Sequence, residues 1–277
     1  PAPGATVAAA AGAPAGPPVA VAAGRDDTLP VLTGVQLRLS GEEMTLSASD
    51  RYRYAVRTLA WKPEAALDGV VEALLPTRRL HEIARSLARC GDVRIGLDPA
   101  GGGMFGFEGG PMRTAVRLME GRLPRHGSLF SVPDAAVAEV EREALAEAVR
   151  RVAVVAEVNS PVRLDFTGDG EGSVLLRAGY ADDVASQRLP AALTGTAEIT
   201  VAFNPAYLLD ALNSFEQPRV RLELLGPGQR ALLSGAEARA EAGDEPGDQS
   251  GGEAVDGTGG EAGGAHRHLL MSVKQLV

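Results

Sequence analysis

The fold is decided by residues 29–56, which read LPVLTGVQLRLSGEEMTLSASDRYRYAV. Apolar and polar residues alternate in two segments of this stretch, Val35–Leu39 and Met44–Ala48. A short polar turn that contains Gly41 separates the two segments. Alternation with a period of two is typical of strands with one buried face, so the stretch predicts a β-hairpin. The hairpin ends in a dense polar and aromatic run, Ser49–Tyr54, which a purely structural hairpin does not need.

Length and composition indicate two domains of ordinary size. The chain has 277 residues, of which 45% are hydrophobic and only 4% aromatic, so the cores should consist mostly of Leu, Val, Ile and Ala. A single cysteine, Cys90, excludes an internal disulfide and fits a cytoplasmic protein. No apolar run approaches the ~20 residues of a membrane span. The first 24 residues carry five prolines and no basic leading segment, which indicates neither a signal peptide nor a span.

Charge is distributed unevenly along the chain. The net charge is −9, and residues 236–265 hold eight acidic side chains, nine glycines and one arginine. This composition predicts a disordered acidic loop, and it leaves the rest of the chain near charge balance. Any basic surface must therefore come from local clusters. Residues 1–18 consist mostly of Ala, Pro and Gly, and we expect a low-complexity lead-in there.

Helical periodicity appears in three segments, which predict helices over residues 77–89, 142–156 and 205–215. In the first, Leu80, Ile83 and Leu87 form one apolar stripe, and Thr77 is the expected N-cap. Residues 19–23 are expected to be the last turn of a further helix. Beyond the hairpin, strands are expected at 52–59, 69–75, 93–97, 104–109, 112–118, 162–166, 174–178, 199–203, 220–224 and 268–273.

These elements recur after about 130 residues. Pro30-Val31 matches Pro161-Val162, and Pro76, before one predicted helix, matches Pro205, before another. An ordered series of matches with a nearly constant offset indicates an internal repeat. We therefore expect two α+β domains, 19–133 and 134–277, each with helices packed on antiparallel sheets. The alternative is two unrelated α+β domains.

Five segments together resemble one family. They are GRDDTLPVLTGV (24–35), LSASDRYRYAV (46–56), LLPTRRLHEIARSL (74–87), VAFNPAYLLDALNSF (201–215) and LLMSVK (269–274). In this order they are similar to the beta subunit of bacterial DNA polymerase III, a sliding clamp. The resemblance implies tandem clamp-type domains, matching the second and third of the three in that family. It also implies a non-catalytic processivity factor of DNA replication, in which self-association into a ring needs a first domain or its equivalent.

The resemblance further implies a cleft that holds short linear peptides of the DNA polymerase, of clamp-loader subunits and of repair proteins. Carried over to this sequence, the cleft comprises Leu32, Ser49, Arg51, Tyr52, Arg53, Tyr54, Pro124, Ser128, Leu129, Asn204, Tyr207, Leu269, Leu270, Met271, Ser272, Val273 and Lys274. The chain departs from the family pattern in the connector, where Leu123 stands at a position that is usually phenylalanine and His126 at one that is usually aromatic. It also departs in the tail, where Ser272 stands where a proline is usual and Lys274 where an arginine is usual. The alternative for the last segment is an ordinary core strand at a sheet edge.

Helices of this family line the central hole and face duplex DNA without sequence preference, through basic side chains. The corresponding residues here are Arg25, Arg78, Arg79, Arg85, Arg89, Arg142, Arg150 and Arg151. Such contacts would be sensitive to salt. The alternative is a solvated helix face. The predicted helix over 205–215 has no basic residue, so the lining would be uneven.

Nothing in the sequence assembles a catalytic or metal site. The histidines, at positions 81, 126, 266 and 268, are dispersed, and the glycine pairs lack a phosphate-loop pattern. We therefore expect no enzyme activity, no metal and no cofactor. Two functions stay open: a DNA clamp that tethers a polymerase, and a shortened clamp paralogue that forms no ring and acts as a peptide-binding or regulatory module.

Overall fold

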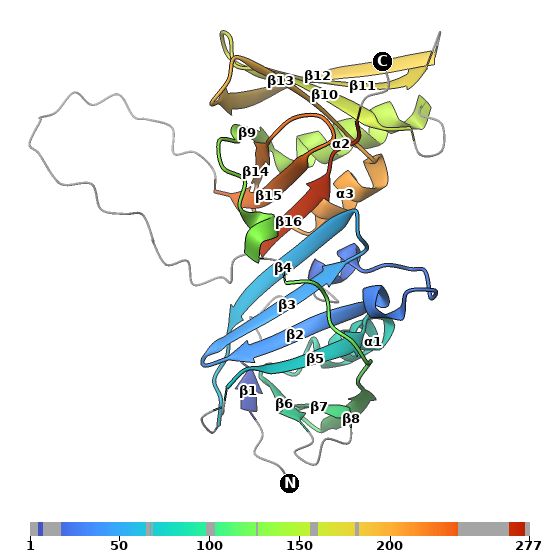
Figure 1. Ribbon diagram of the computed structural model, residues 1–277, viewed down its shortest axis with the longest axis vertical. Coiled ribbons are helices and arrows are strands. Elements are labelled where there is room, and N and C mark those ends of the chain that lie inside the picture. The colour runs from blue at the N-terminus through green and yellow to red at the C-terminus, as the bar shows by residue number, and fades with distance from the viewer. Residues whose placement is uncertain are drawn as a thin grey trace, which may run out of the picture.

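The computed structural model describes residues 5–7, 18–64, 67, 69–97, 103–125, 127–155, 160–180, 183–237 and 266–274. These residues form two similar α+β units that follow one another along the long axis of the molecule (Figure 1). Almost all of the predicted acidic loop, and all of residues 1–18 except Ala5–Val7 and Pro18, lie outside the described residues. No helix in the described ranges is long and apolar enough to cross a membrane.

The first unit is built on the predicted hairpin. Strands β2 (Gly34–Ser40) and β3 (Glu43–Ser49) pair in register around Gly41, whose φ of 56° suits a glycine in a tight turn. Strand β4 (Arg53–Ala60) adds to β3, and β5 (Val71–Pro76) adds to β2. A second sheet has the order β1-β6-β7-β8, with bounds Ala5–Val7, Val93–Leu97, Met104–Gly109 and Met112–Arg117. Helix α1 (Thr77–Leu87) follows β5 directly.

The second unit repeats this order of strands and helices. Its strands are β9 (Ala136–Glu141), β10 (Val162–Thr167), β11 (Ser173–Tyr180), β12 (Asp183–Thr194), β13 (Glu198–Phe203), β14 (Arg219–Leu224), β15 (Arg230–Ala236) and β16 (His266–Met271). Its helices are α2 (Arg142–Val152) and α3 (Pro205–Asn213). Strand β9 pairs with β14 as β1 pairs with β6, so the two units share one pairing scheme.

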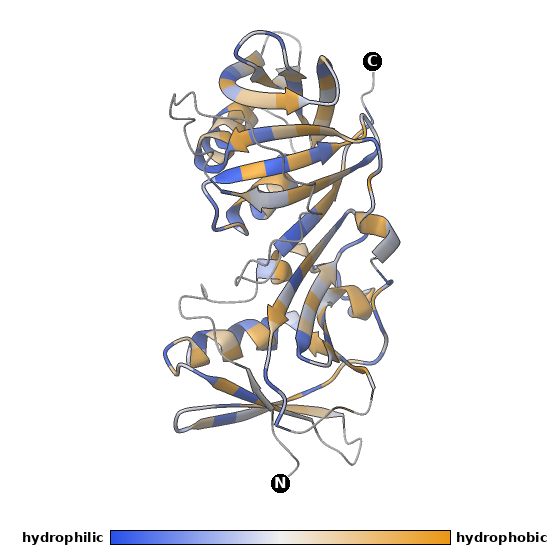
Figure 2. Cartoon of the chain, turned by 90° about the vertical axis from the view of Figure 1, so that its left-hand side faces the viewer, coloured by the Kyte–Doolittle hydropathy of each residue, from blue (hydrophilic) through white to orange (hydrophobic). Residues whose placement is uncertain are grey.

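A strand pair joins the two units. Strand β16 of the second unit pairs antiparallel with β4 of the first, and Leu270 lies opposite Arg53. The result is a single sheet of twelve strands with the order β13-β10-β11-β12-β9-β14-β15-β16-β4-β3-β2-β5. Apolar and polar residues alternate along many of its strands (Figure 2), as expected when only one face is buried.

Three apolar clusters hold the molecule together. The largest packs α2 and α3 against the second unit's strands, and another packs α1 against the first unit's sheets. A third cluster lies at the junction and includes Tyr54, Phe130 and Leu269. Because this third cluster draws on both units, the junction has an apolar core of its own as well as ladder hydrogen bonds.

Several predicted elements differ from the observed ones. Residues 18–22 form a 3₁₀ helix, η1 (Pro18–Ala22), rather than an α-helical turn. The expected N-cap at Thr77 is wrong: Pro76 is the N-cap, and Thr77 is the first helical residue. Helix α2 ends at Val152 and continues as a 3₁₀ turn, η4 (Ala153–Val155). Strands β1, β9, β12 and β15 were not expected, and β1 corrects the prediction of a structureless lead-in over residues 1–18, because it pairs with β6.

Candidate functional site

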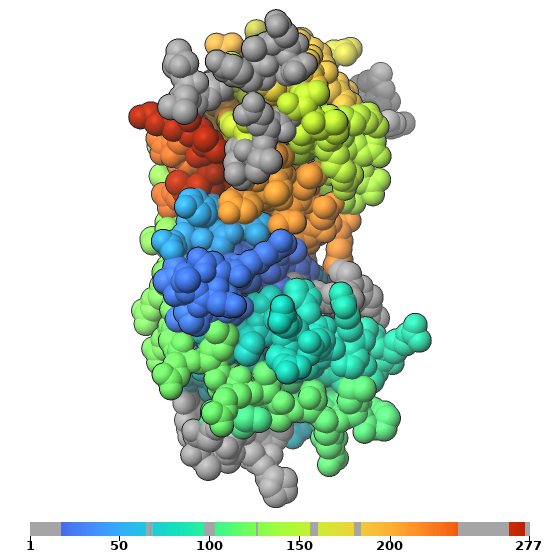
Figure 3. Space-filling view, turned by 90° about the vertical axis from the view of Figure 1, so that its right-hand side faces the viewer, coloured from blue at the N-terminus to red at the C-terminus, as the bar shows by residue number. Residues whose placement is uncertain are grey.

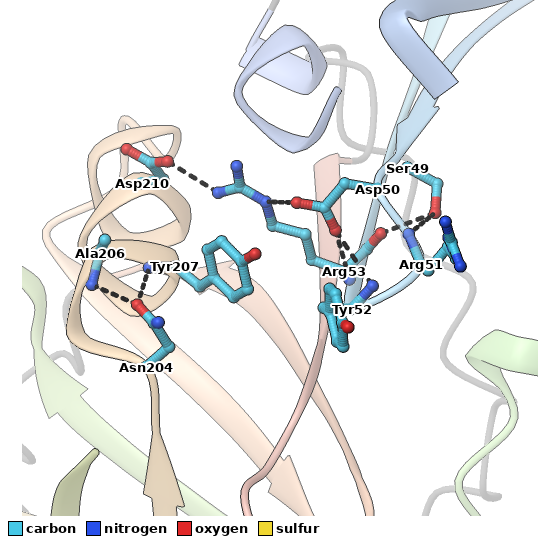
Figure 4. Close-up of polar contacts among 9 residues, drawn as sticks. All are labelled: Ser49, Asp50, Arg51, Tyr52, Arg53, Asn204, Ala206, Tyr207 and Asp210. Carbon is cyan, nitrogen blue, oxygen red and sulfur yellow. Dashed lines mark hydrogen bonds and ion pairs between the residues drawn. The ribbon is translucent and has the colours of Figure 1, made fainter. Parts of the chain in front are cut away.

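The predicted cleft residues gather where the units join. Most of them come from the β3–β4 turn of the first unit and from the start of α3 (Figure 4), from the end of β16 and from the segment that connects the units. The pairing of β16 with β4 brings the end of β16 to the turn, and the backbone N–H of Met271 donates to the carbonyl oxygen of Tyr52 at 2.9 Å. The start of α3 reaches the same turn through side chains, because Tyr207 stacks on Tyr52 and Asp210 pairs with Arg53. These segments are far apart in the sequence, so only the fold unites them.

The β3–β4 turn is fixed by its own side chains. The Asp50 carboxylate accepts hydrogen bonds from the backbone N–H groups of Tyr52 and Arg53 at 3.0 and 3.1 Å. The Ser49 hydroxyl accepts from the Arg51 N–H and donates to the Arg53 carbonyl oxygen. Arg51 has a φ of 83°, a left-handed conformation that is unusual for a residue with a side chain. The turn thus presents Tyr52 outward from a strained backbone.

Two tyrosines form the exposed wall of the site. The rings of Tyr52 and Tyr207 are stacked, with centroids 6.2 Å apart and an interplanar angle of 27°. Tyr52 is 60% exposed. Tyr207 lies in the first turn of α3, which Asn204 caps by accepting from the N–H groups of Ala206 and Tyr207. Asn204 therefore serves here as the residue that starts the helix carrying Tyr207.

Arg53 lies behind this wall rather than in it. Its side chain is only 5% exposed, and its guanidinium contacts Asp50 and Asp210 at 2.8 and 2.7 Å. The guanidinium carbon is 4.4 Å from the centroid of the Tyr207 ring, a cation–π distance. We expected Arg53 to line the cleft, and its charge is instead satisfied internally.

The last described residues divide between core and surface. Leu269 and Leu270 are buried, whereas Met271 and Val273 are each 38% exposed. The N–H of Met271 donates to the Tyr52 carbonyl oxygen, and that of Val273 donates to the Ala202 carbonyl oxygen. Ser272 is buried, and its N–H donates to the Gln229 carbonyl oxygen at 2.9 Å. The N–H that a proline would lack is therefore used in the fold. Lys274 is exposed.

The connector between the units, which contains Pro124, Ser128 and Leu129, forms hydrogen bonds with both units. The Tyr54 hydroxyl donates to the Pro124 carbonyl oxygen at 3.0 Å, and burial raises the pKa of this phenol above its usual value. The Arg230 guanidinium donates to the carbonyl oxygens of Ser128 and Leu129. Leu32 lies farther back, in the short helix η2 (Pro30–Thr33), where its carbonyl oxygen accepts from the Gly24 N–H. His126 lies outside the described residues.

Two histidines lie in the junction next to the site. His266 contacts the Ser214 hydroxyl and the Val56 carbonyl oxygen, and burial, aided by Arg57, lowers its pKa to about 4. His268 is fully buried, neither of its ring nitrogens has a hydrogen-bond partner in the described structure, and burial holds its pKa well below the usual value. These two histidines are two residues apart on β16. Sequence reasoning weighed the histidines only as metal or catalytic groups, so it missed their burial in the junction. No group of three or more metal-binding side chains occurs in the described ranges.

The predicted DNA-facing arginines fall into two groups. Arg25, Arg78, Arg85 and Arg89 are exposed, and none has an ion-pair partner among the residues the structure describes. The others are engaged: Arg79 with Glu82, Arg151 with Glu147, Arg150 with the Asn213 side chain, and Arg142, largely buried, with the Gln217 carbonyl oxygen and Glu143. Figure 3 shows the surfaces of α1, α3 and α2 following one another over one face of the molecule.

Comparison with known proteins identifies the family. The profile described as "DNA polymerase III beta subunit, central domain" matches residues 17–125, and the profile for its C-terminal domain matches residues 128–242. The chain belongs to the DNA polymerase III beta subunit family. The two profiles follow each other without overlap, as the two clamp units do.

Relatives in this family cover most of the chain. The beta sliding clamp of Streptomyces coelicolor is 45% identical over 230 residues, which are 82% of this chain and 60% of that protein. The beta sliding clamp homolog GriR of Streptomyces muensis is 41% identical, over 78% of this chain and 57% of that protein. This family member therefore spans about 60% of the length of the relatives that it matches.

Solved sliding clamps share the fold. The DNA polymerase sliding clamp of Bacillus subtilis matches with a TM-score of 0.74 at 20% identity, covering 94% of this chain and 61% of that one. The sliding clamp of Pseudomonas aeruginosa solved with griselimycin bound also matches with a TM-score of 0.74 at 20% identity, covering 93% and 62%. The prediction of tandem α+β clamp domains is confirmed, whereas the boundary at 133/134 stays a prediction.

Proposed function

We propose that this chain acts in DNA replication as a sliding clamp that tethers polymerase, clamp-loader and repair proteins by holding their short linear peptides at the junction of its two units. One observation carries the proposal: the Tyr52–Tyr207 pair, Met271 and Val273 place partly exposed aromatic and apolar groups together at this junction. Extended peptides with apolar anchors bind such surfaces, and tyrosine is a frequent hot-spot residue. The griselimycin-bound clamp of Pseudomonas aeruginosa supports ligand binding in the family.

Duplex DNA is the second proposed partner. Arg78 and Arg85 of α1, Arg89 just beyond its end, and Arg25 are exposed and have no ion-pair partner among the described residues. Such side chains contact phosphates independently of sequence. Encircling a duplex requires further clamp-type units besides the two described here, and we propose that they close the ring. The protein would then work in the cytoplasm, without catalysing a reaction itself.

A labelled peptide of the Gln-x-x-Leu-Phe type tests the site. Fluorescence anisotropy should show binding with a Kd on the order of micromolar, and Met271→Asp should weaken it at least about tenfold, because a carboxylate would face the apolar anchors. Met112→Asp is the matched control, because Met112 is also 38% exposed but lies on β8 of the small sheet. Absence of binding, or equal losses in both variants, would overturn the peptide site.

A shortened clamp paralogue that forms no ring is the second candidate function. It is favoured by the fact that the described residues of the two units form the whole tyrosine wall. The similarity to GriR, described as a clamp homolog, also fits this candidate. Peptide binding without retention on circular duplex DNA would favour it, whereas retention would favour the ring.

A further inference from the structure

Asp210 connects the two units through a single guanidinium. It lies on α3 one turn after Tyr207, and its Oδ2 accepts from Arg53 Nη1 at 2.7 Å. Asp50 Oδ2 accepts from Arg53 Nε at 2.8 Å. Arg53 is therefore held by one carboxylate from each unit, and Figure 4 shows it between them.

Because Arg53 is buried, both carboxylates are needed to stabilise and orient its guanidinium. The Arg53 side chain is almost completely buried, and a buried guanidinium that loses a partner pays for its desolvation without full compensation. The planar fork of arginine also has a fixed donor geometry, so two carboxylates define its orientation rather than only its charge state. Asp210 is thus one of two groups that determine where the guanidinium lies.

The guanidinium in turn contacts the wall of the site. Its carbon is 4.4 Å from the Tyr207 ring centroid, and this ring stacks on Tyr52. A chain of contacts therefore runs from Asp210 through Arg53 to the two tyrosines. A shift of the guanidinium would change the position of the Tyr207 ring and with it the spacing of the wall.

We propose that Asp210 is a positioning residue of the peptide site, which holds Arg53 against Tyr207 and so fixes the arrangement of the Tyr52–Tyr207 wall. The proposal rests on the function proposed above and adds a residue outside the predicted cleft. Asp210 itself touches no peptide in this scheme. Its effect on binding passes entirely through Tyr207.

Glu216 supplies a matched control. It also links the second unit to an arginine of the first, because its Oε1 lies 3.6 Å from Arg57 Nη1. Its side chain is well exposed and contacts neither tyrosine of the wall in any interaction described here. Glu216→Gln therefore removes a carboxylate from the same junction and leaves the side-chain contacts from Asp210 through Arg53 to Tyr207 in place.

The first test needs no ligand. The protein has four tyrosines, and incorporation of 3-fluorotyrosine gives one ¹⁹F NMR signal for each, assigned by single Tyr→Phe variants. Asp210→Asn should shift or broaden the signals of Tyr52 and Tyr207 and leave the other two in place, and Glu216→Gln should shift neither wall signal. Unchanged Tyr52 and Tyr207 signals in folded Asp210→Asn protein would overturn the proposal.

The second test is a double-mutant cycle on peptide affinity. Asp210→Asn should raise the Kd of the Gln-x-x-Leu-Phe peptide about tenfold in the unaltered protein but less than about twofold in a Tyr207→Ala background. Equal losses in both backgrounds would show that Asp210 acts independently of Tyr207 and would refute the proposal. Asp210→Glu keeps the charge and should restore most of the affinity, which separates positioning from misfolding. If the unaltered protein binds no peptide, the proposed function fails, and the NMR result still decides the role of Asp210.

Discussion

Nε2 of His266 lies 2.8 Å from the hydroxyl oxygen of Ser214, while Nδ1 of the same ring lies 3.2 Å from the carbonyl oxygen of Val56. A carbonyl oxygen can only accept, so Nδ1 carries the proton in the neutral ring. Val56 belongs to the first unit, and Ser214 ends α3 of the second. One neutral imidazole therefore bridges the two units inside the junction.

This arrangement predicts that acid weakens the folded protein. Burial and the neighbouring Arg57 lower the pKa of His266 to about 4, so the unfolded chain takes up this proton near pH 6.5 while the folded chain does not. Stability is then complete above about pH 6.5 and falls as the pH drops toward 4, by about 3 kcal/mol from this residue alone. Urea unfolding at pH 7.5, 6 and 5 measures the effect.

Matched variants separate the contribution of the His266 imidazole to the loss of stability in acid from that of the carboxylates, which titrate in the same range. Arg57 is the charged group that acts on His266, and it also pairs with Glu216. His266 and Arg53 act on His268, whose pKa is lowered mainly by burial. His266→Gln should flatten the decline in stability between pH 6.5 and 5. His81→Gln, on α1, should leave it unchanged. Identical slopes in both variants would contradict the assignment.

Arg51→Gly should stabilise the protein. Arg51 has a φ of 83°, which costs a residue with a Cβ about 1 kcal/mol or more relative to glycine. The Asp50 and Ser49 hydrogen bonds that shape the turn do not use the Arg51 side chain, so they survive the change. Chemical unfolding should show a gain of up to about 1 kcal/mol, and Arg51→Ala should show none. A loss in the glycine variant would mean that the arginine side chain itself stabilises the turn.

Ser272→Ala should destabilise the end of β16. The Ser272 hydroxyl accepts from the Gln229 N–H at 2.9 Å and lies within hydrogen-bond distance of the carbonyl oxygens of Gly226 and Gln229. Its removal leaves a part-buried N–H without its partner, at a cost of about 1–2 kcal/mol. Urea unfolding and hydrogen exchange at Gln229 measure this loss. Ser272→Thr keeps the hydroxyl and should recover part of the stability; equal losses would contradict the hydrogen-bond explanation.

Removal of two exposed arginines, Arg85 on α1 and Arg89 just beyond its end, should weaken binding to duplex DNA. Arg85→Ala with Arg89→Ala removes two positive charges, and the slope of log K against log salt should become shallower by about 2. Anisotropy of a labelled duplex between 50 and 200 mM salt, roughly the range over which such contacts change most, measures the slope. Arg113→Ala, on β8, removes an 80% exposed arginine from the small sheet and should leave the slope unchanged. If Arg113→Ala changed the slope as much as the double variant does, the result would contradict a DNA-binding surface at α1 and the turn after it.

Local patterns predicted the hairpin and all three α-helices, because alternation and the i, i+3, i+4 spacing report directly which face each element buries. They did not predict β12, whose sequence includes Pro190 and lacks a sustained apolar alternation. The sequence also gives no sign of the pairing between β16 and β4, since register across units depends on tertiary packing.

For the site, resemblance brought together residues that the fold indeed places side by side, such as Tyr52 and Tyr207. The resemblance did not distinguish residues whose side chains are exposed at the site from residues that are buried behind it. Arg53, Leu269 and Leu270 are buried, and Asp210, which holds Arg53, was not among the predicted residues. Its position one turn after Tyr207 is a signal that could have suggested it, because residues i and i+3 share a helix face.

The strand pair between β16 and β4 has a mechanical consequence. Rotation of one unit against the other would have to break the ladder of hydrogen bonds at this junction and open the apolar cluster around Phe130. The angle between the units is therefore set by the twist of one continuous sheet, and the two units together form a stiff, curved body. In the ring proposed above, each chain would set part of the curvature, and opening would begin at the contacts between chains.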